Sequence, residues 1–493
     1  MTSEESVRER MASGLKVSFV SQVLYVVANA GLIVVLTRYL LTPEGYGLLS
    51  FALSILGVTQ LFLGLGLAKS GARFVTEYIE SDETQVRHIV RTTLLYVGVA
   101  TVVVSVVFWA VGGRLAGLLG RPAVEPFLAV GVGYLALYPF AIAVRLLFNA
   151  FNRVEWSGVF RTVDGVVRFV FAAGFVLAGF GAVGALYGYL AGFLVSAVLG
   201  LVVFYRRFYR SLPTGGDPES GLRRRIARYG VPLTVTSGAD VLDKRVDMVL
   251  VGVLVNPVAV GYYTLAKQIA DFAIVPARSI DTTLAPRLGE RKASDQGQSA
   301  SRIYESALRH VLLLYVPAGV GLALVAEPTI RYVFGANYLD AVPLVQLFGV
   351  LIVIDAVNQI TTNSLDYLGR GRERAIANGG TSVANFVLNL LLIPAFGALG
   401  AAVATVVTHA GYTVINVSYI YREFPFRVRR LLFESGVVVG ISAGMGAIVY
   451  YARTFVSGLP SLLAVIALGG AVWAALAVYS GLLDTRLVES VLS

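Results

Sequence analysis

Ionisable residues recur inside two apolar stretches of the chain, where each costs about 2.5–3.5 kcal/mol unless it meets a partner or water. Positions 236, 240, 243, 244 and 247 follow the spacing i, i+4, i+7, i+8 and i+11, which is one face of a helix. A second stripe follows about 25 residues later. The charged members of the two stripes are Asp240, Asp243, Lys244, Arg245, Asp247, Lys267, Asp271, Arg278 and Asp281.

The basic members of these stripes suit an anionic ligand. Ammonium and guanidinium groups bind phosphate and pyrophosphate through charge-assisted hydrogen bonds. We therefore predict that a phosphate-bearing head group contacts Lys244, Arg245, Lys267 and Arg278. The acidic neighbours would balance charge or bind a coupling ion: Asp240, Asp243, Asp247 and Asp271. The alternative is that the charges pair with one another and only hold two helices together.

Other intramembrane polar residues extend these candidates. Asp355 lies in the middle of an apolar span and is a candidate for a coupling cation. Arg145 and Arg168 are further candidates for the head group, although snorkelling to the interface is the favoured reading for both. Asp164 lies four residues before Arg168, which also favours a simple ion pair.

Aromatic and amide side chains have two readings each. Four tyrosines could stack on sugar rings, and an ordinary aromatic belt is the favoured alternative. They are Tyr25, Tyr46, Tyr262 and Tyr263. The stripe Asn378, Ser382, Asn385 and Asn389 is interpreted as interhelical hydrogen-bonding contacts.

The elements that carry these residues are predicted to be membrane-spanning helices. The chain of 493 residues is 56% hydrophobic and only 14% charged, whereas a soluble protein is about one-quarter charged. A spanning helix needs about 20 mostly apolar residues. Fourteen stretches meet this requirement: 15–37, 46–68, 90–112, 124–148, 162–180, 182–204, 229–254, 258–284, 305–326, 341–366, 374–394, 397–420, 432–452 and 460–481.

The distribution of basic residues predicts the orientation of these spans. With the N-terminus in the cytoplasm, 29 of the 40 Lys and Arg residues fall in cytoplasmic segments, 5 in outer loops and 6 within spans. Positive residues are concentrated on the cytoplasmic side of membrane proteins. We therefore predict a multi-pass protein of the cell (cytoplasmic) membrane with both termini in the cytoplasm.

Two pairs of segments indicate an internal duplication. Residues 41–52 resemble 255–266 at an offset of 214, and residues 181–206 resemble 397–422 at an offset of 216. The unit of six helices predicts two parallel bundles around a central cavity, with two additional C-terminal helices. The fold class is thus an all-α integral membrane protein with about 14 transmembrane helices. The predicted parts are 1–205, a linker at 206–228, 229–421 and 422–493.

Several functions are excluded by the sequence. The chain has no cysteine and only three widely separated histidines, which argues against metal sites. No GxxxxGK[ST] loop is present for ATP, and no outer loop is long enough for a catalytic domain. The net charge of +10 is explained by membrane topology and not by nucleic-acid binding. We expect neither an enzyme nor a cofactor.

Several motifs resemble the polysaccharide and oligosaccharide flippases of the multidrug/oligosaccharidyl-lipid/polysaccharide exporter superfamily. They are residues 41–47 (LTPEGYG), 64–69 (GLGLAK) with Arg73, 333–335 (VFG) with Tyr338, and 385–404 (NFVLNLLLIPAFGALGAAVA). The resemblance covers nearly the whole chain. It implies two bundles around a cavity that opens alternately to each side, and outward flipping of a polyprenyl- or dolichyl-linked glycan. The family has no fixed catalytic motif, so it assigns no site residue here.

The predicted function is therefore translocation of a lipid-linked oligosaccharide for cell-surface polysaccharide or glycoprotein assembly. Its partners would be membrane lipids, this substrate and a coupling cation, and a path within one chain requires no second copy. One alternative is a cation-coupled multidrug antiporter of the same superfamily, which needs the acidic but not the basic residues. The other is a non-transporting scaffold for glycan assembly, in which neutral substitutions in 229–284 leave function intact.

Overall fold

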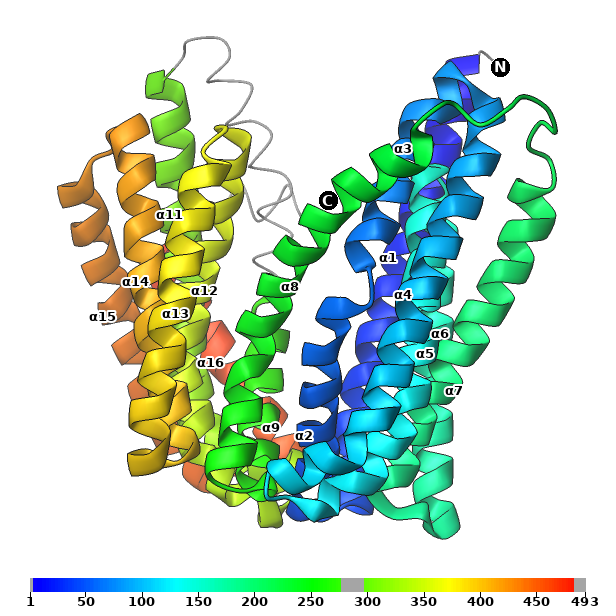
Figure 1. Ribbon diagram of the computed structural model, residues 1–493. Helices are drawn as coiled ribbons and strands as arrows, with labels where there is room; N and C mark the ends of the chain where they lie inside the picture. The colour runs from blue at the N-terminus through cyan, green and yellow to red at the C-terminus, as the bar shows by residue number, and fades with distance from the viewer. Residues whose placement is uncertain (1–2, 276–296, 483–493) are drawn as a thin grey trace. The chain divides into compact units, whose positions relative to one another are not determined.

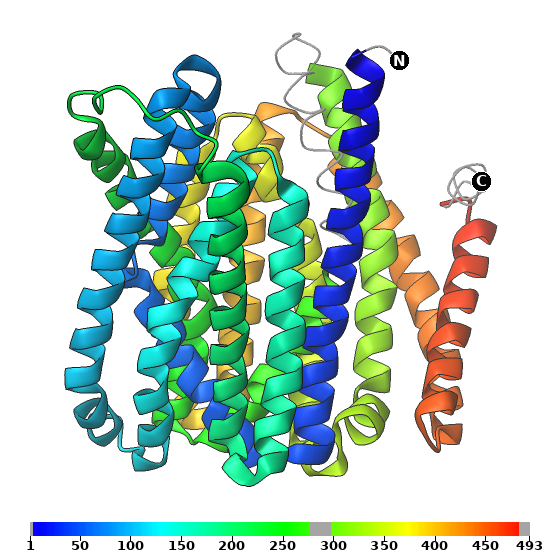
Figure 2. The same cartoon turned by 90° about the vertical axis from the view of Figure 1, so that its right-hand side faces the viewer.

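The computed structural model describes residues 3–275 and 297–482, and all regular elements within these ranges are helices. The side chains of residues 3–16, 18–19, 235–240, 243 and 297–300 lie outside this description. The chain divides into two compact units, unit 1 at Met1–Val253 and unit 2 at Leu254–Ser493. Figures 1 and 2 show the helices of each unit running side by side as long rods.

Unit 1 is built around α6, which packs against α1 on one side and α7 on the other. The helix α5 contacts α4, α3, α2 and α7. The elements are α1 (Ser3–Val35), η1 (Leu36–Leu40), α2 (Pro43–Thr59), η2 (Gln60–Phe62), α3 (Leu65–Ser81), α4 (Glu83–Leu118), η3 (Pro122–Val124), α5 (Glu125–Ala150), α6 (Val154–Phe175), η4 (Val176–Phe180), α7 (Gly181–Phe204), η5 (Tyr205–Tyr209) and α8 (Leu222–Leu254).

Unit 2 is built around α12, which packs against α9, α11 and α14. Its last two helices, α15 and α16, pack against each other and against α11. The elements are α9 (Pro257–Ala273), α11 (Gly297–Thr329), η6 (Ile330–Phe334), η7 (Ala336–Ala341), α12 (Val342–Tyr367), α13 (Gly371–Phe396), α14 (Ala398–Glu423), α15 (Val428–Ala452), η8 (Arg453–Phe455) and α16 (Leu459–Tyr479).

Eleven helical segments among the described residues are long and apolar enough to cross a membrane, so the chain is a multi-pass membrane protein. One of them, Val154–Tyr209, is 56 residues long and contains two predicted spans, 162–180 and 182–204. The eleven segments thus cover twelve predicted spans. Of the other two, 229–254 falls on α8 and the start of 258–284 falls on α9, neither of which is in this set, while 276–284 lies outside the described residues. The total of fourteen stays a prediction.

The predicted span 46–68 is wrong as a single helix, because the chain turns at Gly64. This residue has φ +67°, a left-handed conformation that glycine adopts without strain. The turn ends the 3₁₀ segment η2 and starts α3 at Leu65. A close helix contact follows, since a Cβ at Gly66 would lie 2.1 Å from the backbone nitrogen of Thr234 in α8.

Backbone geometry recurs at both pairs of segments in the predicted duplication. The side chains of Thr42 and Asn256 cap α2 and α9 by accepting hydrogen bonds from the backbone three residues later, and a proline follows each. Gly181 and Gly397 precede or begin α7 and α14 with φ of +57° and +60°. Equal caps and equal turns at the expected offsets agree with the predicted repeat, while the parallel arrangement of two bundles stays a prediction.

The segment between η5 and α8 forms hydrogen bonds with α3 and α4 of the same unit. Gln85 donates through Nε2 to the carbonyl of Asp217 (3.1 Å) and accepts through Oε1 from the backbone N–H of Glu219 (2.9 Å). Arg225 donates to both Tyr78 (3.0 Å) and Glu219 (2.7 Å), and Tyr78 also hydrogen-bonds Glu219. These contacts connect the start of α8 to α3 and α4.

The boundary between the two units, between Val253 and Leu254, lies further along the chain than the predicted linker at 206–228. Residues 229–253, predicted to begin the second bundle, belong to unit 1 by their contacts. Ser54 in α2, for example, donates to the sulfur of Met248 in α8 (3.3 Å). Contacts and repeats divide the chain by different criteria, and the predicted boundaries at 205, 229 and 421 stay a prediction.

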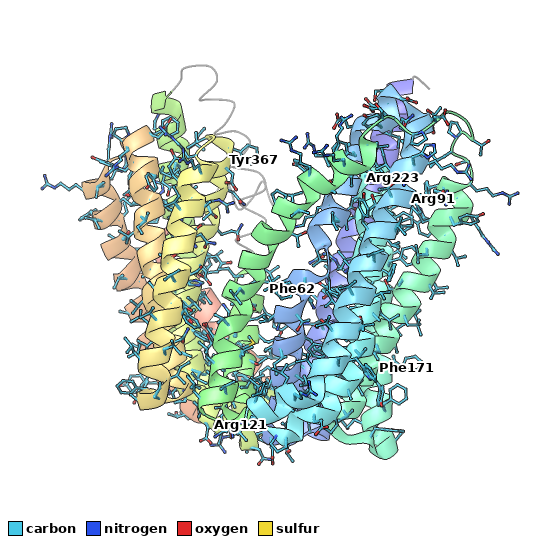
Figure 3. The ribbon with its side chains drawn as sticks, in the orientation of Figure 1. Phe62, Arg91, Arg121, Phe171, Arg223 and Tyr367 are labelled. Carbon is cyan, nitrogen blue, oxygen red and sulfur yellow. The ribbon has the colours of Figure 1, made fainter. Side chains whose placement is uncertain are left out.

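Basic residues mark the two ends of unit 1. Arg91 and Arg223 lie toward one end, and Arg121 lies at the other (Figure 3). Arg121 donates to the backbone carbonyls of Gly252 (3.1 Å) and Val253 (3.3 Å) at the end of α8. This separation agrees with the predicted inner location of Arg91 and Arg223 and outer location of Arg121. Which end faces the cytoplasm stays a prediction.

Candidate functional site

A partly buried charged cluster lies between α1, α5, α6 and α7 in unit 1, with Asp164 and Arg168 buried and Arg161 exposed. We call it the Asp164 site and define it by Tyr25, Arg145, Arg161, Asp164, Arg168 and Tyr189. Asp164 and Arg168 are only 3% and 6% exposed. The snorkelling expected of Arg168 is therefore wrong, because its side chain is enclosed by neighbouring helices.

Glycines create the space for this cluster. A Cβ at Gly192 in α7 would lie 2.7 Å from the Asp164 carboxylate oxygen Oδ1 and 3.1 Å from Cβ of Arg168. A Cβ at Gly165 would lie 2.9 Å from the ring of Tyr25. Because real Cβ atoms do not approach so closely, a larger residue at either position would displace the cluster.

Three guanidinium groups act electrostatically on the single carboxylate of the Asp164 site. Arg168, Arg145 and Arg161 all attract Asp164 electrostatically. Arg161 also donates from Nη1 to Oε1 of Gln22 in α1 (2.7 Å). The cluster has an excess of positive charge, and in a low-dielectric interior such an excess favours an anion.

Some polar atoms of the cluster have unused hydrogen-bonding capacity. Oδ1 of Asp164 and both Nε and Nη2 of Arg168 are buried without a hydrogen-bond partner. The guanidinium carbon of Arg168 lies 4.9 Å from the ring centre of Tyr189 and 5.7 Å from that of Tyr25. Leaving a buried donor unsatisfied costs about 1–3 kcal/mol. The Asp164 oxygen can therefore accept a hydrogen bond from water or a ligand, and the two Arg168 nitrogens can donate hydrogen bonds to them.

Stacked tyrosines adjoin the cluster on α5. The rings of Tyr134 and Tyr138 are stacked with centres 5.7 Å apart, and Phe193 meets both edge-on. Gln60 donates to the hydroxyl of Tyr134 (2.8 Å). This aromatic wall was missed in the sequence analysis, although the spacing of 134 and 138 places both rings on one helix face.

Of the predicted site residues on α8, Arg245 lies near the Asp164 site, and the side chains of two others are outside the described part of the chain. Arg245 packs over Gly57 of α2, where a Cβ would lie 3.2 Å from its Nε. It also interacts electrostatically with Tyr134, Tyr138 and Tyr189. Lys244 is exposed and Asp247 is buried. The side chains of Asp240 and Asp243 lie outside the described part of the chain.

In the described part of the predicted stripe, Lys267 and Asp271 of α9 form an ion pair. Lys267 Nζ lies 3.8 Å from Oδ1 of Asp271, with the two side chains 18% and 55% exposed. This pair is the i, i+4 contact that the pairing alternative anticipated. Arg278 and Asp281 lie outside the described residues.

Unit 2 contains a different polar interior. Nδ1 of His409 in α14 lies 2.7 Å from Oδ1 of Asp355 in α12, and both side chains are about one-quarter exposed. Asn385 in α13 donates to Thr408 (3.2 Å) and accepts from Asn389 (2.8 Å). The interpretation of the asparagine stripe as interhelical contacts is confirmed for Asn385.

Two functional candidates were missed at the level of sequence. Arg161 was assigned to a cytoplasmic loop, but positions 161, 164 and 168 have the spacing i, i+3 and i+7 of one helix face, which could have revealed it. His409 was set aside because it belongs to no metal motif. Its partner lies 54 residues earlier, and no local spacing connects the two. No group of three His, Cys, Asp or Glu suited to a metal occurs in residues 3–275 and 297–482.

The fold and its buried charges define a multi-pass helical membrane protein of the transporter type. A family model described as "Polysaccharide biosynthesis protein" matches residues 12–292, more than half of the chain, and a second model, MatE, matches residues 232–391. The chain belongs to the polysaccharide biosynthesis protein family. The predicted relationship to the exporter superfamily is thereby confirmed.

Two similar proteins with assigned descriptions also support a membrane protein of glycan assembly. A probable low-salt glycan biosynthesis flippase of Haloferax volcanii is 22% identical over 413 residues, covering 80% of this chain and 82% of the relative. A lipopolysaccharide biosynthesis protein of Escherichia coli is 24% identical over 367 residues, covering 71% and 69%. One relative is described as a probable flippase and the other as a lipopolysaccharide biosynthesis protein, and together they support a flippase or transporter as the class.

Solved structures share the fold. A lipid II flippase in an inward closed conformation has a TM-score of 0.77 at 14% identity, covering 94% of this chain and 98% of that one. An inward-facing multidrug resistance transporter of the MATE family has a TM-score of 0.66 at 17% identity, covering 84% and 96%. At these identities the likeness establishes the fold alone.

Proposed function

We propose that this protein translocates a lipid-linked oligosaccharide across the cytoplasmic membrane by alternating access. The observation that carries the proposal is the Asp164 site, where three arginines act electrostatically on one carboxylate and Arg168 holds two unused donors. A phosphate or pyrophosphate offers the charge and the acceptor oxygens that these groups lack.

The sugar part of the substrate would meet the neighbouring aromatic wall. Tyr134 and Tyr138 present stacked rings beside Tyr189 and the cationic Arg245. Aromatic rings bind the apolar faces of sugars, while tyrosine hydroxyls hydrogen-bond at their edges. Arg245 therefore joins Arg145, Arg161 and Arg168 as a proposed head-group contact. Lys244, Lys267 and Arg278 stay predictions of the same kind.

Energy for the cycle would come from an ion, and Asp355 is the proposed coupling residue. Its contact with His409 joins two protonatable groups on two helices, α12 and α14. Ionisable pairs within membranes often serve as proton relays. Protonation of either partner would change this interhelical contact and so bias one conformation over another.

The charge of the Asp164 site argues against the multidrug alternative. A transporter of cationic drugs needs an interior with excess negative charge, whereas this site has three cations to one anion. The scaffold alternative predicts that neutral substitutions inside the helices are harmless. The arrangement of unused donors at Arg168 favours a binding role instead.

Deletion of the chromosomal copy tests the proposal in cells. Lipid-linked glycans are extracted and their exposure to a membrane-impermeant glycan-modifying reagent is measured on each membrane face. Accumulation of unflipped intermediates inside, reversed by the wild-type chain and not by R168Q, is the expected result. Normal surface glycan after deletion, or full rescue by R168Q, would overturn the proposal. Sensitivity to cationic drugs without a glycan defect would favour the antiporter.

A further inference from the structure

A second charged site lies in unit 2, at one end of α11, α14 and α15. It is a pocket of about 520 Å³ that we call the Arg302 pocket. Its charged lining is Arg302, Glu305, Arg309, Glu423, Arg427, Arg430 and Glu434. None of these residues was a candidate in the sequence analysis, and none belongs to the Asp164 site.

The carboxylates of the pocket are already engaged. Glu434 lies 2.9 Å from Nε of Arg430 and 3.9 Å from Nη1 of Arg309. Glu423, also in the lining, lies 2.8 Å from Arg370. Glu305 interacts electrostatically with Arg430. Two of the three acidic groups, Glu423 and Glu434, therefore neutralise arginines by ion pairing.

Positive groups remain after this pairing. Among the described residues, Arg302 and Arg427 form no ion pair, and both are exposed at the pocket. Nε of Arg309 is buried without a hydrogen-bond partner. A half-open pocket with two guanidinium groups outside any ion pair and one unused donor is suited to an anion with several acceptor oxygens.

The position of the pocket identifies the source of that anion. The membrane-spanning segments Ser301–Phe334, Ala398–Glu423 and Val428–Phe455 all begin or end at this pocket, which places it at the boundary between membrane and water. Leu432 and Phe433, just beyond Arg430, are 67% and 73% exposed. These two side chains lie outside the pocket lining but on the same end of α15, where an exposed apolar helix surface fits acyl chains near a lipid phosphate.

We propose that the Arg302 pocket binds the phosphate of an anionic membrane lipid, separately from the transported substrate. Arg302 and Arg427 contact the phosphate, Arg309 donates from Nε, and the acyl chains lie along Leu432 and Phe433. The lipid bridges the start of α11 and the start of α15, so it stabilises the contact between these helices.

Native mass spectrometry of the full chain in micelles containing phosphatidylglycerol tests this proposal. The double variant R302Q/R427Q removes the two uncompensated charges. The matched control R206Q/R210Q removes two exposed charges from the corresponding predicted membrane side of unit 1. We expect the first variant to lose about 10- to 30-fold in lipid affinity, on the scale of about fivefold for each basic residue at a membrane surface, and the control to lose none.

Further arms separate the sources of the anion. Phosphatidylcholine at equal concentration should bind far less than phosphatidylglycerol, and 10 mM inorganic phosphate should leave the lipid adducts in place. Equal phosphatidylglycerol binding by R302Q/R427Q and wild type would overturn the site. Displacement of the lipid by inorganic phosphate would overturn the lipid as its ligand and assign the pocket to a free anion. The L432S/F433S variant should weaken lipid binding without changing the binding of phosphate.

Discussion

The interiors of the two units use different chemistry at corresponding places in a repeated framework. At the offset of 216 that relates Gly181 to Gly397, positions 189, 192 and 193 of α7 correspond to 405, 408 and 409 of α14. The first set is Tyr, Gly and Phe, and the second is Thr, Thr and His. In unit 1 the glycine admits a buried carboxylate and arginine. In unit 2 Thr408 instead accepts a hydrogen bond from Asn385.

Under the proposed function, this difference separates two tasks. The guanidinium groups and tyrosines of unit 1 suit recognition of a charged, sugar-bearing head group. The amides, hydroxyls and Asp355–His409 pair of unit 2 suit interhelical contacts that respond to protonation. A duplicated scaffold can thus hold a binding site in one copy and a coupling element in the other, because only a few helix-facing positions differ.

The largest expected effect is that of Arg168→Gln. Arg168 is the strongest of the three guanidinium groups that attract the buried Asp164, and removing one partner of a buried charge interaction typically costs about 3–5 kcal/mol. The thermal midpoint of the purified protein in detergent should fall steeply, and R168K should recover part of the loss. The double variant D164N/R168Q should be more stable than R168Q alone. An unchanged midpoint in R168Q would refute the assignment of a buried pair to unit 1.

A smaller loss is expected when the contact in unit 2 is broken by Asp355→Asn. A hydrogen bond to a charged group contributes about 1.5–3 kcal/mol. The control is D366N, because Asp366 pairs with Arg374 at an exposed position (2.9 Å), where such pairs contribute about 0.2–1 kcal/mol. Thermal unfolding should rank D355N below D366N. The reverse order would remove the basis for a special role of the Asp355–His409 pair.

Gly192→Ala tests the space that distinguishes α7 from α14. Its new Cβ would lie 2.7 Å from backbone and side-chain oxygens of Asp164, and overpacking of this kind costs about 1–3 kcal/mol. Gly174 on α6 is a matched control, because a Cβ there would meet nothing within 4 Å. Unfolding curves should show destabilisation by G192A and none by G174A. Equal behaviour of the two variants would mean that Gly192 does not shape the site.

Asn385→Ala should have a modest effect, in keeping with the neutral interior of unit 2. Interhelical hydrogen bonds within membranes average about 0.6 kcal/mol, with a maximum near 1.7. Asn385 contacts both Thr408 and Asn389, so a midpoint shift of one or two degrees is expected in detergent. A loss as large as that of R168Q would erase the contrast between the two units.

The smallest effect concerns the hydrogen bonds that hold the segment before α8 against α3. Its hydrogen bond to Glu219 raises the pKa of Tyr78 above the ordinary 10.0. The neutral phenol is therefore favoured in the folded protein, so this contribution is complete below pH 10 and is lost as the pH rises through the higher folded value. Protease cleavage within 210–221 should increase above pH 10 in the wild type. Y78F should show faster cleavage already at neutral pH and no further rise of this origin.

Much of the fold could be predicted from the sequence because the membrane restricts the backbone to long apolar helices. Twelve predicted spans coincide with helices of the structure, and the two caps and two glycine turns occur at the predicted repeats. The turn at Gly64 was missed because the apolar pattern continues through it. The α-helix ends at Thr59, a 3₁₀ segment follows, and the positive φ of Gly64 completes the turn.

The candidate site was predicted less completely. Spacing along one helix identified Asp164, Arg168 and the Lys267–Asp271 pair, since neighbours on a helix face are fixed by its period. It could not show that Gly192 leaves room for Asp164, or that Arg245 packs over Gly57 of α2. Those relations join positions 28 and 188 residues apart, and they depend on which helices become neighbours.

The most direct test of the central claim is head-group translocation in vesicles. The full-length wild type, R168Q, R168K and R206Q are reconstituted with a fluorescent polyprenyl-pyrophosphate oligosaccharide, and a membrane-impermeant quencher reports how much has crossed. We predict equal rates for wild type and R206Q, a reduced rate for R168K and no protein-dependent crossing for R168Q. Translocation by folded R168Q at the wild-type rate would contradict the assignment of the head group to the arginines of unit 1.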